Sequence, residues 1–137
     1  MNRIFLITGV LFLFFRVSGQ QADSLGYTTL KPAAFREELA IVNNPLIIDV
    51  REFFEFRKSR INGAINIPAS GSIDVPADTI DKARHLFLYC TSGFRSKRVA
   101  QKLAERSFIH VYSLDGGITE WKKEGYSIDR KKLRKRD

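Results

Sequence analysis

The only cysteine of this chain stands where an apolar run gives way to a polar loop. Cys90 ends the stretch HLFLYC, and the loop TSGFRS leads from it into a helical pattern. Successive loop amides can form an anion-binding nest, and the first turn of a helix adds unpaired N–H groups and the positive end of its dipole. Gly93 allows backbone angles that a side chain would forbid, and Arg95 and Arg98 add positive charge. The stretch therefore favours a thiolate and predicts a nucleophilic Cys90 that needs no general-base histidine.

The two histidines do not extend this chemistry. His85 and His110 each begin an apolar run, at the end opposite to the loop, and we expect them to be structural. One cysteine and two separated histidines lack the spacing of metal ligands, so neither a metal nor another cofactor is expected. The alternative for a single thiol is a buried, inert core residue.

The length of the loop argues against a phosphatase. Tyrosine and dual-specificity phosphatases have a loop one residue longer than the four residues between Cys90 and Arg95, so that it can encircle a phosphate. The position one further on is Ser96, and no general acid is evident. Phosphatase chemistry is therefore disfavoured, and so is arsenate reduction, which would need a similar cradle.

Short apolar runs alternate with helical patterns along the chain. The runs LIID (46–49), AINI (64–67), HLFLYC (85–90) and HVYSL (110–114) are typical of central strands that are buried on both faces. The helical patterns are PAAFREELAIV (32–42), RSKRVAQKLAER (95–106) and ITEWKKEG (118–125). Pro32 suits a first helical position, and Gly125 suits a C-terminal cap. The alternation predicts an α/β fold of three layers, with a mostly parallel central sheet flanked by helices.

Two polar stretches fall at the carboxyl ends of predicted strands, where ligands of such folds bind. They are residues 49–52 and residues 90–96. Together with two further stretches, they resemble the motifs of rhodanese-like sulfurtransferases, in which a cysteine and a basic residue bracket four loop residues. The four stretches are LIIDVRE (46–52), INGAINIP (61–68), the CTSGFR loop and LDGGITEWKKEGY (114–126). The resemblance covers about a hundred residues, and its four motifs occur in the order of that family.

This resemblance implies a sulfurtransferase built on a single rhodanese-like domain. Cys90 would take a sulfane sulfur from a donor such as thiosulfate, carry it as a persulfide, and pass it to a thiophilic acceptor such as cyanide or a protein thiol. The implied substrate-binding residues are Thr91, Ser92, Gly93, Phe94, Arg95 and Ser96. Asp49 and Arg51 match the strand-end pair of the family and are assigned to supporting the loop. For this pair, an ion pair that fixes the sheet edge and direct contact with substrate both remain open.

The chain departs from the family pattern in two places. Many relatives have Gly-His before the I-x-G-A motif, whereas this chain has Ser59 and Arg60. Loss of that glycine would remove a left-handed turn residue. The second departure is FFEF (53–56), which is richer in phenylalanine than the usual short helix.

The two ends of the chain differ in composition from its body. An apolar run follows Arg3, and Val17, Ser18 and Gly19 are small enough for a signal-peptidase site. The run is too short to cross a bilayer core of about 30 Å. We therefore predict a signal peptide (1–19), a linker (20–26), a rhodanese-like domain (27–128) and a basic C-terminal tail (129–137). An uncleaved N-terminal anchor is the alternative.

The charge belongs mostly to the tail. The whole chain carries a net charge of +8, but residues 20–129 hold fifteen basic and fourteen acidic residues. A nearly neutral domain does not predict nucleic-acid binding, and the solvated tail is expected to make at most weak contact with a membrane surface. The predicted protein is exported, periplasmic or secreted. Its partners are a sulfane-sulfur donor and a thiophilic acceptor, which includes an acceptor protein. The alternative function is a non-catalytic module that carries a persulfide or anion to a partner protein.

Overall fold

The computed structural model describes residues 26–133 of the chain. The predicted signal peptide, the predicted linker up to residue 25 and residues 134–137 of the predicted tail lie outside this part. Within residues 26–133, no helix is both long and apolar enough to span a membrane.

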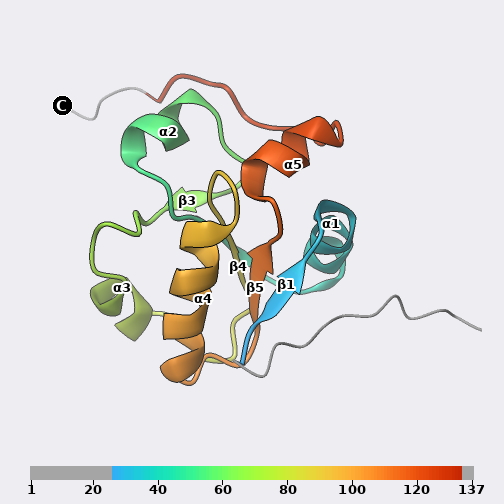
Figure 1. The fold of residues 1–137 in the computed structure, drawn as a ribbon. Coiled ribbons are helices and arrows are strands. Elements are labelled where there is room, and N and C mark those ends of the chain that lie inside the picture. Colours follow the sequence, from blue (N-terminus) through green and yellow to red (C-terminus); the bar gives the residue numbers. More distant parts are fainter. Residues whose placement is uncertain (1–25, 134–137) are drawn as a thin grey trace, which may run out of the picture.

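A five-stranded, wholly parallel sheet forms the centre of the fold (Figure 1). Its strands are β1 (Thr28–Leu30), β2 (Leu46–Asp49), β3 (Ile65–Asn66), β4 (Leu86–Tyr89) and β5 (Val111–Leu114). Their spatial order is β1-β5-β4-β2-β3, so β4 lies in the middle of the sheet between β2 and β5. Because all strands run in the same direction, their carboxyl ends meet at one edge. Cys90 follows β4 at the centre of that edge.

Helices cover both faces of the sheet. They are α1 (Pro32–Ile41), α2 (Phe53–Lys58), α3 (Asp74–Asp78), α4 (Phe94–Glu105) and α5 (Gly117–Lys123). On the face covered by α3 and α4, Val99 and Leu103 share one buried cluster with Leu88. On the face covered by α1 and α5, Phe35 and Trp121 share a second cluster, with their ring centroids 6.1 Å apart. The short helix α2 lies beyond the carboxyl edge of the sheet, at the same end of the fold as α5 (Figure 1).

Strand β4 shows why the sequence contains unbroken apolar runs. Its side chains alternate between the two faces, with Leu86 and Leu88 in the cluster beneath α4 and Phe87 and Tyr89 in the cluster beneath α1 and α5. All four residues are fully buried. A strand covered on both faces needs a side chain that tolerates burial at every position, and alternation of polar and apolar residues therefore disappears.

The predicted α/β fold and its parallel sheet are confirmed. The predicted strands and helices all form, and their ends differ by one or two residues from the structure. Gly125 follows α5 with φ +82°, the left-handed conformation of a C-terminal cap. The sequence analysis missed β1, because Thr28 and Thr29 leave its three residues without an apolar run. This strand forms by pairing at the sheet edge with β5.

The departure at Ser59 and Arg60 has a different consequence from the one expected. Ser59 has φ −163° and ψ 145°, an extended conformation that any residue adopts, so no left-handed turn is lost. Arg60 is buried and donates from Nη2 to the Asp129 carboxylate at 2.6 Å and to the Lys131 carbonyl at 3.1 Å. The backbones of Arg60 and Asp129 also form an antiparallel bridge. The start of the predicted tail is thus held against the domain.

Candidate active site

The loop between β4 and α4 turns back onto the sulfur of Cys90. The Cys90 residue is only 1 % exposed, and the N–H of Gly93 donates to its Sγ at 3.1 Å. Gly93 has φ +96° and directly precedes α4. This left-handed turn lets the chain enter the helix while the first free amides of the helix still face the sulfur.

Hydrogen-bond donors around Cys90 favour its ionised form. Burial alone would raise the pKa of the Cys90 thiol, because burial disfavours the charged thiolate. The backbone N–H and the hydroxyl of Ser96, together with the backbone N–H groups of Ser92 and Gly93, outweigh this effect and bring the pKa below its ordinary value. Three amides and one hydroxyl therefore act on the sulfur.

The hydroxyl of Ser96 belongs to a short buried chain of hydrogen bonds. Ser96 is fully buried in the first turn of α4, and its Oγ donates to the Gly93 carbonyl at 3.1 Å. The hydroxyl of Ser113, on β5, donates to Ser96 Oγ at 2.9 Å. Because a hydroxyl has one proton that rotates freely, the Ser96 proton can turn from the Gly93 carbonyl to the Cys90 sulfur when charge forms there.

Helix α5 holds the loop from the opposite side. The N–H of Ile118 donates to the Cys90 carbonyl at 2.9 Å, and the N–H of Thr119 donates to the Thr91 carbonyl at 3.2 Å. In a trans peptide the N–H points away from the preceding carbonyl. With these two carbonyls fixed toward α5, the N–H groups of Thr91 and Ser92 point away from it. The N–H of Ser92 is one of the donors that lower the Cys90 pKa.

The close approach of α5 to the loop depends on glycine. Gly117 has φ +60°, and a Cβ atom there would lie 2.5 Å from the carbonyl oxygens of Cys90 and Thr91. A Cβ atom at Gly93 would lie 3.3 Å from the nitrogen of Gly116. Any side chain at Gly117 would therefore displace the loop that carries the cysteine.

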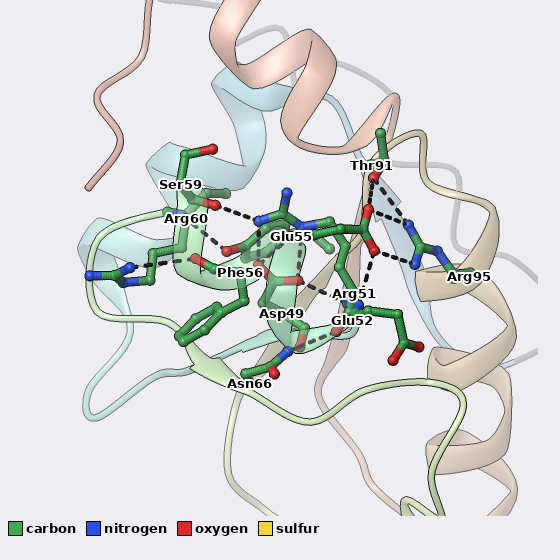
Figure 2. A network of polar contacts seen from close by, with 12 residues as sticks. Asp49, Arg51, Glu52, Glu55, Phe56, Ser59, Arg60, Asn66, Thr91 and Arg95 are labelled. Carbon is green, nitrogen blue, oxygen red and sulfur yellow. Dashed lines mark hydrogen bonds and ion pairs between the residues drawn. The ribbon is translucent and has the colours of Figure 1, made fainter. Parts of the chain in front are cut away.

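Arg95 reaches from α4 to Glu55 on α2 (Figure 2). Its Nη1 donates to Glu55 Oε2 at 2.9 Å, and its Nη2 donates to Glu55 Oε1 at 3.1 Å and to the Thr91 hydroxyl at 3.0 Å. That hydroxyl donates in turn to Glu55 Oε1 at 3.0 Å. The hydrogen bonds from Arg95 contribute most to lowering the pKa of Glu55 to about 2, so this carboxylate is ionised at neutral pH. The predicted anion-binding Arg95 is thus paired here, with 35 % of its side chain exposed.

Asp49 and Arg51 form a buried ion pair behind the loop (Figure 2). Arg51 Nη2 donates to Asp49 Oδ2 and to the Ser59 carbonyl, both at 2.6 Å. The two side chains are 0 % and 6 % exposed, so the ion pair is buried in this structure. Within residues 26–133, neither makes a hydrogen bond to residues 91–96, so their support of the loop is indirect. Arg51 holds the end of α2, the helix whose Glu55 holds Arg95.

The comparisons with known proteins agree with this geometry. Residues 32–124 match the family described as Rhodanese-like domain. The chain belongs to the rhodanese-like family. It is 33 % identical over 120 residues to the uncharacterized protein YqhL of Bacillus subtilis, covering 88 % of this chain and 92 % of YqhL. It is 33 % identical over 85 residues to the thiosulfate sulfurtransferase GlpE of Coxiella burnetii, covering 62 % of this chain and 78 % of GlpE.

A solved structure shows the same fold. The crystal structure of a rhodanese-related protein from Thermoplasma volcanium has a TM-score of 0.66 and 26 % sequence identity to this chain. The similarity covers 75 % of this chain and 98 % of that protein.

The remaining predicted residues lie at the rim of this rhodanese-like site or away from it. Ser92 and Phe94 are exposed, and the guanidinium of Arg98 lies over the Phe94 ring, 5.9 Å from its centroid. His85 and His110 stack with their ring centroids 4.1 Å apart. They directly precede β4 and β5, so they lie at the amino edge of the sheet, far from the cysteine.

Two residues of this rhodanese-like site escaped the sequence analysis. Glu55 lies within the phenylalanine-rich FFEF stretch, and its partner Arg95 is 40 residues further along the chain. Gly117 belongs to the quoted LDGGITEW motif, but only the structure shows that it packs against the backbone of the loop. The signal for Glu55 in the sequence was its position in the first turn of the helix that follows β2.

Proposed function

We propose that this protein is a sulfurtransferase that carries a sulfane sulfur as a persulfide on Cys90. The Cys90 thiolate attacks the outer sulfur of thiosulfate, a bond forms between Sγ and that sulfur, and sulfite leaves with the electron pair of the broken S–S bond. A thiophilic acceptor such as cyanide then attacks the sulfane sulfur. The bond to Sγ breaks, thiocyanate leaves, and the electron pair returns to Cys90 as a thiolate. The cycle needs no oxidant, reductant or proton transfer.

The N–H of Gly93, which donates to the Cys90 sulfur at 3.1 Å, is the observation that carries this proposal, and the amides of Ser92 and Ser96 and the Ser96 hydroxyl help to lower the Cys90 pKa. Such donors favour the thiolate in both of its roles, as the attacking nucleophile and as the leaving group. They would also stabilise the negative outer sulfur of a persulfide. Since no proton moves, the chemistry requires no histidine beside the cysteine, and the two histidines lie at the other edge of the sheet.

Thiosulfate as the donor rests on family membership and on similarity to a thiosulfate sulfurtransferase. The Arg95 side chain bears a charge that can attract an anionic donor, and the Cys90 charge acts on it in turn. Both terminal nitrogens of the Arg95 guanidinium donate to Glu55, so a bound donor must compete with this carboxylate for them. We therefore expect thiosulfate to bind weakly, with a high KM.

Steady-state turnover tests the proposal. Purified protein lacking residues 1–19 is mixed with thiosulfate and cyanide, and thiocyanate is measured as the product. We expect turnover that Cys90→Ser abolishes while the thermal unfolding midpoint of the protein changes little. Turnover that persists in the Cys90→Ser variant would overturn the proposal. Uptake of sulfur without turnover would instead identify a carrier module.

We also propose that the protein acts outside the cytoplasm, after removal of residues 1–19. The support for this is the sequence pattern alone, since these residues lie outside the described part of the chain. The N-terminal sequence of protein recovered from the producing cell tests it. A mature chain that begins at Gln20 supports export, and a chain in the cytoplasm that retains Met1 contradicts it.

A further inference from the structure

A groove beside Arg95 runs along α4 and is larger than thiosulfate requires. It has a volume of about 270 Å³ and is lined by Glu52, Ala69, Ser70, Arg95, Arg98, Val99 and Lys102. Arg95 links the groove to the active-site loop, because its side chain lines the groove and its Nη2 donates to the hydroxyl of Thr91, the residue after Cys90, at 3.0 Å. The volume lies near the lower end of the range for small-molecule sites, which suits a small organic ligand better than a protein segment.

The groove carries more positive charge than its walls neutralise. Arg98 and Lys102 are four residues apart on α4 and therefore share one face of the helix. Both are exposed, and within residues 26–133 neither forms an ion pair with a carboxylate. The guanidinium of Arg98 lies over the ring of Phe94, and Glu52 is the one carboxylate among the residues that line the groove. Arg95 is already paired with Glu55, and the Glu52 side chain accepts from the backbone N–H of Glu55 in the capping box of α2, so Arg98 and Lys102 are the cations that the groove offers to a ligand among the described residues.

We infer that this groove is an acceptor subsite that selects small thiols bearing a negative group, such as a carboxylate or sulfonate. The inference rests on the proposed function and names the acceptor class for that site. The anionic group would pair with Arg98 and Lys102, which places the thiol beyond Arg95 at the sulfur of Cys90. The thiolate of the acceptor attacks the sulfane sulfur, an S–S bond forms, and the bond to Cys90 Sγ breaks. The products are an acceptor persulfide and the Cys90 thiolate, and the acceptor's thiol proton goes to solvent.

The test separates sulfur loading from sulfur transfer. Protein is first loaded with thiosulfate, and the gain of one sulfur is read by intact mass. The loaded protein is then mixed with mercaptoethanesulfonate, mercaptoethanol or cysteamine, which are anionic, neutral and cationic thiols of similar size. The second-order rate of persulfide loss is measured for each thiol. Comparing a variant with the wild type for the same thiol removes differences in intrinsic nucleophilicity.

We expect the combined Arg98→Gln and Lys102→Gln variant to lose about tenfold in rate with mercaptoethanesulfonate, since each exposed charge pair is worth up to about fivefold. The rate with mercaptoethanol should stay unchanged, and the rate with cysteamine should rise. Glu52→Gln should act in the opposite sense and raise the rate with mercaptoethanesulfonate about twofold. Lys123→Gln removes a 75 % exposed charge at the far end of α5 and serves as the control that changes none of these rates.

The failure of this inference differs from the failure of the proposed function. Equal losses with all three thiols, or no loss with the anionic one, would overturn the acceptor subsite while leaving sulfur transfer intact. If thiosulfate adds no mass, the proposed donor is wrong, and the persulfide is made with inorganic polysulfide before the same rates are measured. If polysulfide adds no mass either, both proposals fall.

Discussion

Replacement of Ser96 by alanine tests how the loop activates its cysteine. The Ser96 hydroxyl is one of four donors that lower the Cys90 pKa, and Ser96→Ala removes it while keeping the backbone N–H of the same residue. A hydrogen bond to a charged group contributes about 1.5 to 3 kcal/mol, and one pKa unit corresponds to about 1.4 kcal/mol. In the thiol form the proton bonds the Gly93 carbonyl, a contact it must give up to reach the thiolate. The lower end of the range therefore applies, and we expect the Cys90 pKa to rise by about one unit.

The assay is a pH titration of thiolate absorbance in the ultraviolet, with the Cys90→Ser variant as the blank for tyrosine ionisation. Ser113→Ala is the matched control, because the Ser113 hydroxyl donates to Ser96 and, within residues 26–133, makes no hydrogen bond to the Cys90 sulfur. We expect it to shift the Cys90 pKa by much less than one unit. Below both pKa values, sulfur uptake by Ser96→Ala should slow by up to about tenfold, in proportion to the lost thiolate. An unchanged pKa in Ser96→Ala, or an equal rise in Ser113→Ala, would refute the assignment.

Three further substitutions test the elements around the loop. Gly117→Ala places a Cβ atom 2.5 Å from the carbonyl oxygens of the loop. We expect this variant to take up no sulfur when its intact mass is measured. Sulfur uptake at the wild-type level would show that the loop tolerates displacement. Asp49→Asn leaves the buried Arg51 without its counter-charge and should cost about 3 kcal/mol or more in urea unfolding; a loss within error would argue against a supporting role. The Glu55 pKa of about 2 lies below its unfolded value of 4.5, so the stability from the Arg95 contact is complete above the unfolded value and lost as pH falls toward 2. Glu55→Gln should therefore flatten the unfolding midpoint across that acidic window, and an unaltered pH profile would contradict the pairing.

The parts of the fold that the sequence predicted are those set by local pattern. β4 is apolar at all four residues and β2 at its first three, because helices cover both faces of the sheet, and this burial leaves a signal in consecutive residues. The position of Cys90 beyond β4 follows from the same signal. By contrast, β1 is a three-residue edge strand, and its pairing with β5 depends on contacts 84 residues away, such as Thr28 with Tyr112.

The parts of the site that the sequence did not predict depend on residues far apart in the chain. Arg95 could be recognised as a cation beside the cysteine, but its pairing with Glu55 joins two helices that only the fold brings together. The buried contact between Arg60 and Asp129 spans 69 residues, so this cation too is paired with a carboxylate that only the fold brings near. The number of charged residues can thus be counted from the sequence. Which of the positive side chains remain unpaired and can bind a ligand is known only from the fold.

Intact mass of the mature protein before and after thiosulfate tests the central claim most directly. We expect a gain of one sulfur atom that cyanide reverses and that the Cys90→Ser variant does not show. A gain that persists in Cys90→Ser, or no gain with either thiosulfate or polysulfide, would contradict the conclusion that the loop makes Cys90 a persulfide carrier.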